Sequence, residues 1–353
     1  MSLRQLVGNR AGRDRLRKMA SGGRVPPSLL FTGPAGVGKR LAALGLAKAL
    51  NCTGYTEPGD ACDACPNCLR IERGEFSDVR VVGPEGSGGQ IKAEAVRQVV
   101  SESPFHPFEG KKRIYIFDEA DRMNPTAANS LLKTLEEPPP WTLLVLITSQ
   151  EGGILPTLLS RCQKVRFLAL TPEEVTEILI TRHGLDREAA RLAAAVSGGS
   201  VSRALSLQGE ELESLRRDAV GLVKVLGGQG ASRAHSMRWA DELSKNPRLT
   251  DLLRLFLGLL RDGIARRCEA EVLHGALEAD LEALVTEASL PRWLDAYTVA
   301  ERALHEIAVR YANKRIAIEN LLLHLGEAAK KLPKDRAGSR SSVLGGSASR
   351  SVS

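Results

Sequence analysis

The chain has 353 residues, of which 43% are hydrophobic and only 4% aromatic, with 49 Lys and Arg against 42 Asp and Glu. This length suits two or three domains with substantial cores, and the shortage of aromatic residues argues against an all-β sandwich and for helix-rich packing. The net charge of +7 permits a nucleic-acid partner without requiring one.

No run of about 18 apolar residues predicts a transmembrane helix. The first residues contain no apolar core typical of a secretion signal. We therefore expect a cytoplasmic protein with no membrane partner.

The first half of the chain alternates short apolar runs with segments of helical periodicity. This alternation is typical of an α/β fold with a parallel sheet. Strands are expected at residues 28–32, 79–82, 113–117, 142–148 and 165–168, and helices at residues 39–50, 91–101 and 126–137.

From residue 170 onward the sequence predicts helices and no convincing strand. Thr171 caps a helix that has Pro172 at its first position and two glutamates in its first turn. Glycine pairs interrupt the pattern at 198–199 and 227–230. We expect four regions, namely an α/β core at 1–169 with an insert at 52–68, a small helical lid at 170–208, a larger helical domain at 209–332, and a disordered Ser-rich tail at 333–353.

The segment after the first expected strand has the form of a phosphate-binding loop. Gly33, Gly36, Gly38 and Lys39 match G-x-x-x-x-G-K between a strand and a helix. In such loops backbone N–H groups surround phosphate oxygens and the lysine reaches the β- and γ-phosphates. This predicts a site for ATP or ADP, the alternative being a glycine-rich turn that only starts a helix. Arg40 replaces the Ser or Thr that ligates Mg²⁺, so we expect Mg²⁺ binding and hydrolysis to be weak or absent.

Polar residues end two of the expected strands. Asp118 and Glu119 follow strand 113–117, and such a pair beside a phosphate loop can hold Mg²⁺ and orient an attacking water. Thr148 or Ser149, at the end of the next strand, is a candidate sensor of the γ-phosphate. The alternative is that each is an ordinary solvated strand end. We interpret the acidic pair as a weak or degenerate catalytic site.

Four cysteines, Cys52, Cys62, Cys65 and Cys68, lie within seventeen residues. Gaps of two residues let neighbouring thiolates bind one ion, and four sulfurs complete a tetrahedron around Zn²⁺. In a cytosolic chain this clustering favours metal over two disulfides or four free thiols. Because no open coordination position is expected, the zinc would be structural.

Three features are distinctive in combination. Residues 131–139 read L-L-K-T-L-E-E-P-P, residues 160–162 read S-R-C, and the cysteine cluster follows the phosphate-loop helix. In this order the chain resembles the clamp-loader branch of the AAA+ ATPases, strongly over residues 1–170 and weakly beyond. The resemblance implies an AAA+ P-loop core, a helical lid, and an all-α collar domain through which ring subunits associate.

The resemblance also implies partners and residue roles. Bacterial clamp loaders are rings that use ATP to open the β sliding clamp and place it on primed DNA for DNA polymerase III, a nucleotidyltransferase holoenzyme. The neighbours implied for this chain are the gamma/tau and delta subunits. The S-R-C arginine of this family reaches into a neighbouring ATP site, which implies that role for Arg161, and the second sensor of the lid maps to Arg203.

Three functions remain under comparison. The G-K-R run at 38–40, the A-D-R-M-N run at 120–124 and the length favour a ring subunit with weak or absent ATPase activity. A gamma/tau-like motor ATPase is the alternative, and residue 40 discriminates between them. A zinc-dependent DNA-binding protein is disfavoured, because acids and bases are mixed around the cysteines and no aromatic, basic stripe is present.

Overall fold

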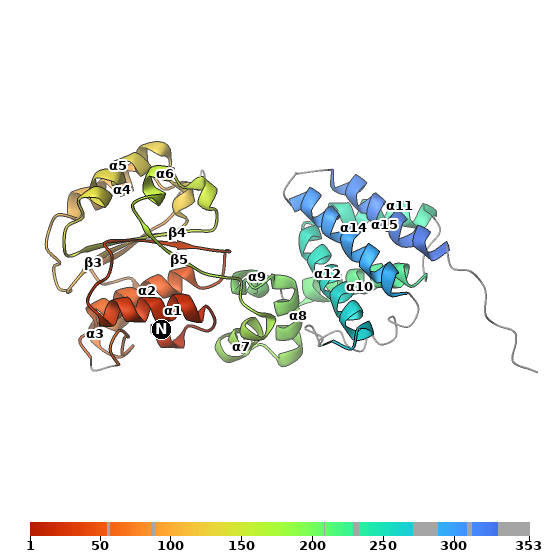
Figure 1. Cartoon of the computed structure of the whole chain (residues 1–353), viewed down its shortest axis with the longest axis horizontal. Coiled ribbons are helices and arrows are strands. Elements are labelled where there is room, and N and C mark those ends of the chain that lie inside the picture. The colour runs from red at the N-terminus through yellow and green to blue at the C-terminus, as the bar shows by residue number, and fades with distance from the viewer. Residues whose placement is uncertain are drawn as a thin grey trace, which may run out of the picture.

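The computed structural model describes residues 1–54, 57–85, 89–207, 209–228, 233–270, 289–308 and 313–330. The tail at 333–353 and part of the expected break at 227–230 lie outside these residues. Figure 1 shows three groups of elements in chain order: a sheet covered by helices, a small helical group, and a larger helical group at the far end.

The sheet has five parallel strands in the order β2-β3-β4-β1-β5. Four of the five expected strand ranges are confirmed. The fifth is shifted by two residues, because pairing of the edge strand with β1, and not hydrophobicity, sets its bounds. The strands are β1 (Ser28–Thr32), β2 (Val79–Val82), β3 (Arg113–Phe117), β4 (Thr142–Thr148) and β5 (Gln163–Arg166).

Helices cover both faces of the sheet (Figure 1). Successive strand residues alternate between the two sides, so Leu29 and Phe31 pack in one core and Leu30 in the other. One face carries α1 (Arg10–Ser21), α2 (Lys39–Asn51) and α3 (Pro66–Arg73), and the other carries α4 (Ala93–Glu102), α5 (Pro125–Glu136) and α6 (Pro156–Leu159). Short turns η1 (Leu3–Gln5), η2 (Ala120–Arg122) and η3 (Glu151–Gly153) complete this part.

After residue 170 the described residues form helices without a strand. The expected helix start is confirmed, because Thr171 and Glu174 form a capping box. The small group contains α7 (Pro172–His183), α8 (Arg187–Ser197) and α9 (Val201–Leu205). The large group contains α10 (Glu210–Leu226), α11 (Arg233–Lys245), α12 (Leu249–Arg267), α14 (Leu290–Ala308) and α15 (Lys314–Lys330), and α8 packs against α12.

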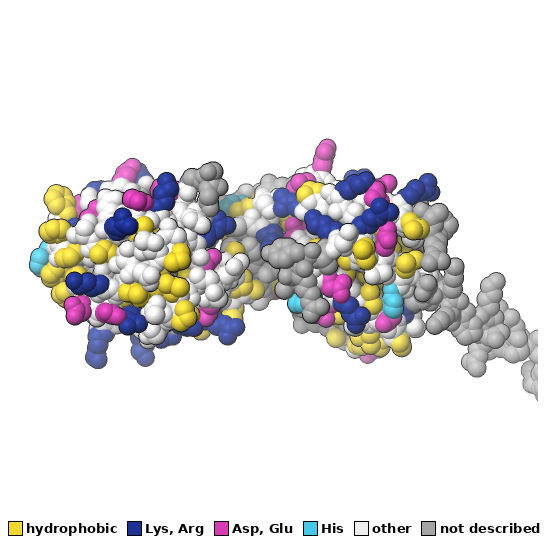
Figure 2. Space-filling model, turned by 90° about the horizontal axis from the view of Figure 1, so that it is seen from above, with side chains coloured by type: hydrophobic (Ala, Val, Ile, Leu, Met, Phe, Trp, Pro, Cys, Tyr) yellow, Lys and Arg dark blue, Asp and Glu magenta, His cyan; other side chains and the backbone are white. Residues whose placement is uncertain are grey.

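The surface has mixed charge. In Figure 2 acidic and basic side chains intermingle over the described residues of both lobes on the face in view. Within the described ranges, no helix combines the length and the hydropathy that a membrane crossing requires.

Candidate functional site

The loop between β1 and α2 is a tight turn built on three glycines. Gly33, Gly36 and Gly38 have φ angles of +138°, +74° and +93°, which favour glycine. A Cβ atom on Gly33 would lie 2.0 Å from the carbonyl oxygen of Phe167. The tight loop therefore depends on glycine at these positions.

Lys39 closes this loop from the first turn of α2. Its Nζ donates hydrogen bonds to the carbonyl oxygens of Gly33, at 2.7 Å, and of Pro34. An ammonium group has three donors, so one remains for an anion. Burial lowers the pKa of Lys39, although Asp118 and Asp121 act in the opposite direction.

The loop opens into a cleft of about 840 Å³. Residues Leu6 and Val7 of the N-terminal segment and parts of α7 and α9 form its other walls. Of the residues expected from the sequence, the structure brings Gly36, Gly38, Lys39, Asp118, Glu119 and Thr148 to this cleft.

The acidic residues of the cleft are engaged by other side chains of the same protein. The guanidinium of Arg40 lies 3.5 Å from Oδ2 of Asp118, and Arg122 pairs with Glu119 at 2.9 Å. Thr148 donates a hydrogen bond of 2.5 Å to Asp121. Asp118 thus faces a guanidinium where a metal-dependent hydrolase presents its carboxylate to Mg²⁺.

Arg203 lies outside the residues that line the cleft. Its Nη1 donates to the carbonyl oxygen of Ser197 at 3.3 Å, and its Nε lies 3.8 Å from Oδ1 of Asp251 on α12. In this conformation the expected sensor residue therefore contacts the larger helical group and not the phosphate loop.

Arg161 is held at the surface by its own chain. Its Nη1 donates to the carbonyl oxygen of Thr157 at 3.0 Å and to Oγ of Ser160 at 3.3 Å. Its Nη2 lies 2.6 Å from Oε1 of Glu136, the last residue of α5. The Arg161 side chain remains 35% exposed, so the guanidinium is accessible.

Sheet topology separates Arg161 from the cleft. β1 and β5 are parallel neighbours, with Leu29 opposite Gln163 and Thr32 opposite Arg166. Arg161 precedes β5, whereas the phosphate loop follows β1, so the two lie at opposite ends of these strands. At about 3.3 Å per residue this separation is roughly 15–20 Å along the strand direction. Arg161 cannot reach the phosphate loop of its own chain.

The four cysteines converge as expected, with their sulfur atoms within 4.8 Å of one another. The Sγ atoms of Cys52 and Cys65 are 3.9 Å apart, and those of Cys62 and Cys68 are 4.0 Å apart. Four thiolates at about 2.3 Å from a tetrahedral ion would lie about 3.8 Å apart, whereas a disulfide requires about 2.05 Å. The geometry therefore fits one metal ion and no disulfide.

The local electrostatics also fit a metal. Backbone N–H groups of Ala64 and Cys65 donate to Sγ of Cys62 at 3.4 and 3.1 Å, which is how thiolate ligands are commonly oriented. Burial raises the pKa of Cys52 and of Cys68. Burial acts the same way on Cys65, but hydrogen bonds involving Thr53 and Cys68 outweigh it and lower the pKa to about 5. Complete ionisation of this cluster needs a nearby cation.

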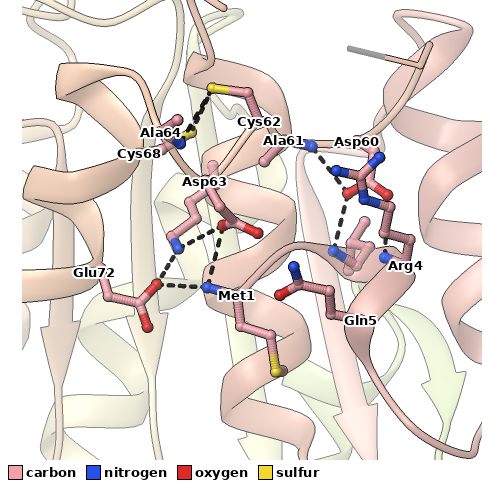
Figure 3. A network of polar contacts seen from close by, with 12 residues as sticks. Met1, Arg4, Gln5, Asp60, Ala61, Cys62, Asp63, Ala64, Cys68 and Glu72 are labelled. Atoms are coloured by element: carbon pink, nitrogen blue, oxygen red, sulfur yellow. Dashed lines mark hydrogen bonds and ion pairs between the residues drawn. The ribbon is translucent and has the colours of Figure 1, made fainter.

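A polar network ties the cysteine insert to the rest of the core, and sequence reasoning missed it (Figure 3). Lys48 of α2 is almost fully buried and contacts Asp63, at 2.9 Å, and Glu72. Burial alone would lower the pKa of Lys48, but these carboxylates raise it above its usual range. In the sequence, this network was indicated only by the acidic residues near the cysteines. From composition alone, such residues are expected to be exposed to solvent.

The parallel sheet, the glycine loop and the acidic strand end form an α/β core with the features of a P-loop fold. The zinc-type cysteine cluster is an insert in that core.

Comparison with known proteins finds relatives that are similar to this core. Residues 8–171 match the family described as "DNA polymerase III, delta subunit". The chain is 38% identical over 205 residues to DNA polymerase III subunit delta' of Bacillus subtilis, covering 58% of this chain and 60% of the relative. It is 34% identical over 214 residues to the delta' subunit of Pseudomonas aeruginosa, covering 60% and 64%. It is 35% identical over 200 residues to subunit tau of Escherichia coli, covering 54% and 30%.

Over these matched residues the chain is similar to delta' and tau subunits of DNA polymerase III. The chain spans less than two thirds of the length of each of these relatives.

Proposed function

We propose that this protein is a delta'-type subunit of a bacterial clamp loader, which helps to place the β sliding clamp on primed DNA. Its neighbours would be gamma/tau and delta subunits, and its compartment the cytoplasm. Its main chemical contribution would be Arg161, inserted into the ATP site of a neighbouring subunit. The three regions at 1–169, 170–208 and 209–332 would act as core, lid and collar.

The position of Arg161 carries this proposal. The residue is exposed, held in one orientation, and too far along the strands to act on the phosphate loop of its own chain. A planar, permanently charged guanidinium suits the stabilisation of a departing phosphoryl group. An arginine so placed supports catalysis only across a subunit boundary.

The contact between Arg40 and Asp118 favours a non-hydrolysing subunit over a gamma/tau-like motor. The loop amides and Lys39 remain available, so we propose that the cleft binds ATP or ADP weakly. Hydrolysis would be very slow, because Arg40 supplies no hydroxyl ligand and places a positive charge beside Asp118. If the isolated chain hydrolyses ATP at the rate of a motor AAA+ protein, the motor alternative is correct.

The four cysteines would hold a structural Zn²⁺ ion. All four ligand positions are filled by sulfur, so no position is left for water or substrate. The metal would stabilise the insert and take no part in the reaction.

The test uses a ring reconstituted with gamma/tau and delta, and measures ATPase activity stimulated by clamp and primed DNA. Arg161→Ala should slow ATP hydrolysis and clamp loading while the subunit stays folded and assembled. Arginine fingers contribute roughly 10³–10⁵ in rate, and one site among several should show less. Arg161→Lys should not restore the rate, because a point charge lacks the two-pronged fork.

Arg166→Ala provides the matched control, since Arg166 is an exposed arginine on the neighbouring strand β5. It should leave the rate unchanged. An unchanged rate in Arg161→Ala, with assembly verified, would remove the proposed role of this residue.

A further inference from the structure

We propose that Asp60 positions one wall of the nucleotide cleft, so that metal at the four cysteines and adenine nucleotide in the cleft strengthen each other's binding. This inference rests on the proposed binding of both ligands. Asp60 belongs to the cysteine insert, two residues before Cys62, yet its hydrogen bonds reach the N-terminal segment (Figure 3).

Asp60 is a buried carboxylate, 2% exposed, that holds the turn η1. Its Oδ1 accepts from the backbone N–H of Leu3 at 2.9 Å, and its Oδ2 accepts from that of Arg4 at 3.0 Å. The first N–H groups of a helical turn have no partner within the turn. Asp60 therefore supplies the acceptors that let this turn form where it does.

The turn lies along the phosphate-loop helix. Leu3 packs over Gly45 of α2, where a Cβ atom would lie 3.1 Å from Cδ2 of Leu3. Leu6 packs in the same way over Gly38, the last glycine of the phosphate loop, at 3.2 Å. Both leucines are almost fully buried. The N-terminal segment thus runs from the cysteine insert to the loop in direct contact with α2.

The same segment forms part of the cleft and contacts the lid. Leu6 and Val7 line the cleft. The carbonyl oxygen of Gln5 accepts a hydrogen bond from Arg182 of α7. One short segment therefore joins the cysteine insert, the phosphate loop and the helix that faces the loop across the cleft.

The metal matters because the insert has little core of its own. Its buried apolar cluster consists of Cys52, Ala61 and Cys68, and two of these three are ligand candidates. Metal–thiolate bonds would therefore supply a large share of the folding free energy of the insert, beside the Lys48 network. Without metal, Asp60 loses its fixed position, and the amides of Leu3 and Arg4 lose their acceptors. Part of the free energy of nucleotide binding is then used to order the N-terminal wall of the cleft, and the measured affinity is lower.

The first experiment measures the ADP affinity of the isolated full chain with one equivalent of Zn²⁺ and after metal removal. Coupling between two sites is typically about 5- to 150-fold, and we expect a loss of about tenfold here. Reciprocity requires that saturating ADP strengthen Zn²⁺ binding by the same factor. Amide hydrogen exchange at Leu3 and Arg4 should also accelerate on metal removal.

Two variants locate the coupling. Asp60→Asn should keep one metal ion per chain, weaken ADP binding in the metal-loaded state, and reduce the effect of metal removal. Leu3→Ala, which alters neither a cysteine nor a residue that lines the cleft, should weaken ADP binding with unchanged metal content. Asp14→Asn is the control, because Asp14 is an exposed carboxylate on α1 that pairs with Arg13.

Equal ADP affinities with and without metal, in protein shown to be metal-free, would overturn the proposal. Slow exchange at Leu3 and Arg4 in that protein would overturn it as well. Absence of ADP binding under every condition would refute the proposed nucleotide site. In that case metal-dependent exchange at Leu3 and Arg4 would still test the role of Asp60.

Discussion

Replacing Arg40 by alanine or threonine distinguishes two causes of the weak Mg²⁺ binding that we propose at the phosphate loop. The Arg40 guanidinium lies 3.5 Å from Oδ2 of Asp118. Alanine removes this competing cation, whereas threonine also restores a hydroxyl that can ligate Mg²⁺. We expect both variants to strengthen Mg²⁺-dependent ADP binding, and threonine to do so more than alanine.

The size of the alanine effect follows from the ion pair. At 3.5 Å two unit charges attract by about 1 kcal/mol in bulk water and about 5 kcal/mol at an effective dielectric constant of 20. The Arg40 side chain is 58% exposed and that of Asp118 is 24% exposed, so the lower value applies. Mg²⁺ must displace an interaction of about 1 kcal/mol, which corresponds to about fivefold in affinity.

Calorimetric titration of the isolated chain with ADP, in Mg²⁺ and in EDTA, measures this ratio. Arg15→Ala is the control, because Arg15 is an exposed arginine of α1 outside the cleft. If Arg40→Ala leaves the ratio of the two affinities at the wild-type value, the guanidinium does not compete with Mg²⁺ and the reasoning fails.

Three further predictions concern stability and assembly. Cys65→Ser should remove the metal and lower the melting temperature of the core, as measured by elemental analysis and thermal denaturation. Asp78→Ala should cost about 3 kcal/mol or more in urea unfolding, because the buried carboxylate accepts three backbone N–H groups at 2.8 Å and pairs with Arg113. Burial alone would raise the pKa of Asp78, but these partners lower it. The stabilisation from ionised Asp78 is therefore complete above the unfolded-state pKa of about 3.9, and it is lost as the pH falls through the folded-state pKa. Asp78→Asn should remove this pH dependence from acid-unfolding curves. A chain ending at residue 208 should stay folded but fail to co-elute with gamma/tau and delta in gel filtration.

The strands β1, β2 and β3 could be predicted because each is a short, mainly apolar run closed by glycine, proline or acidic residues, and β4 because it is a continuous, mainly apolar run of seven residues. The edge strand β5 was misplaced by two residues, since only Val165 among its four residues is buried. The fourth helix begins at Ala93 and not at Ile91, because Ile91 forms a bridge with Met123 from a distant segment. The sequence did not indicate that pairing.

For the candidate site, too, local sequence patterns could be predicted and contacts between distant segments could not. The phosphate loop and the cysteines are local patterns, so their residues could be named before their positions were known. The roles of Asp60 and Lys48 depend on contacts across tens of residues, and their isolated sequence context resembles solvated surface. The motif places Arg203 in the lid. The orientation of its side chain depends on the contact with Asp251, which lies 48 positions later in the chain.

A main-chain hydrogen bond joins the phosphate loop to α9. Val201 donates its N–H to the carbonyl oxygen of Gly36 at 2.9 Å, so this contact is made of main chain and is insensitive to most side-chain changes. α9 is tied to the large helical group through Arg203 and Asp251, and that group extends far from the loop (Figure 1). We expect that any tilt of α9 at Gly36 would displace the distal helices of the large group farther than the loop itself.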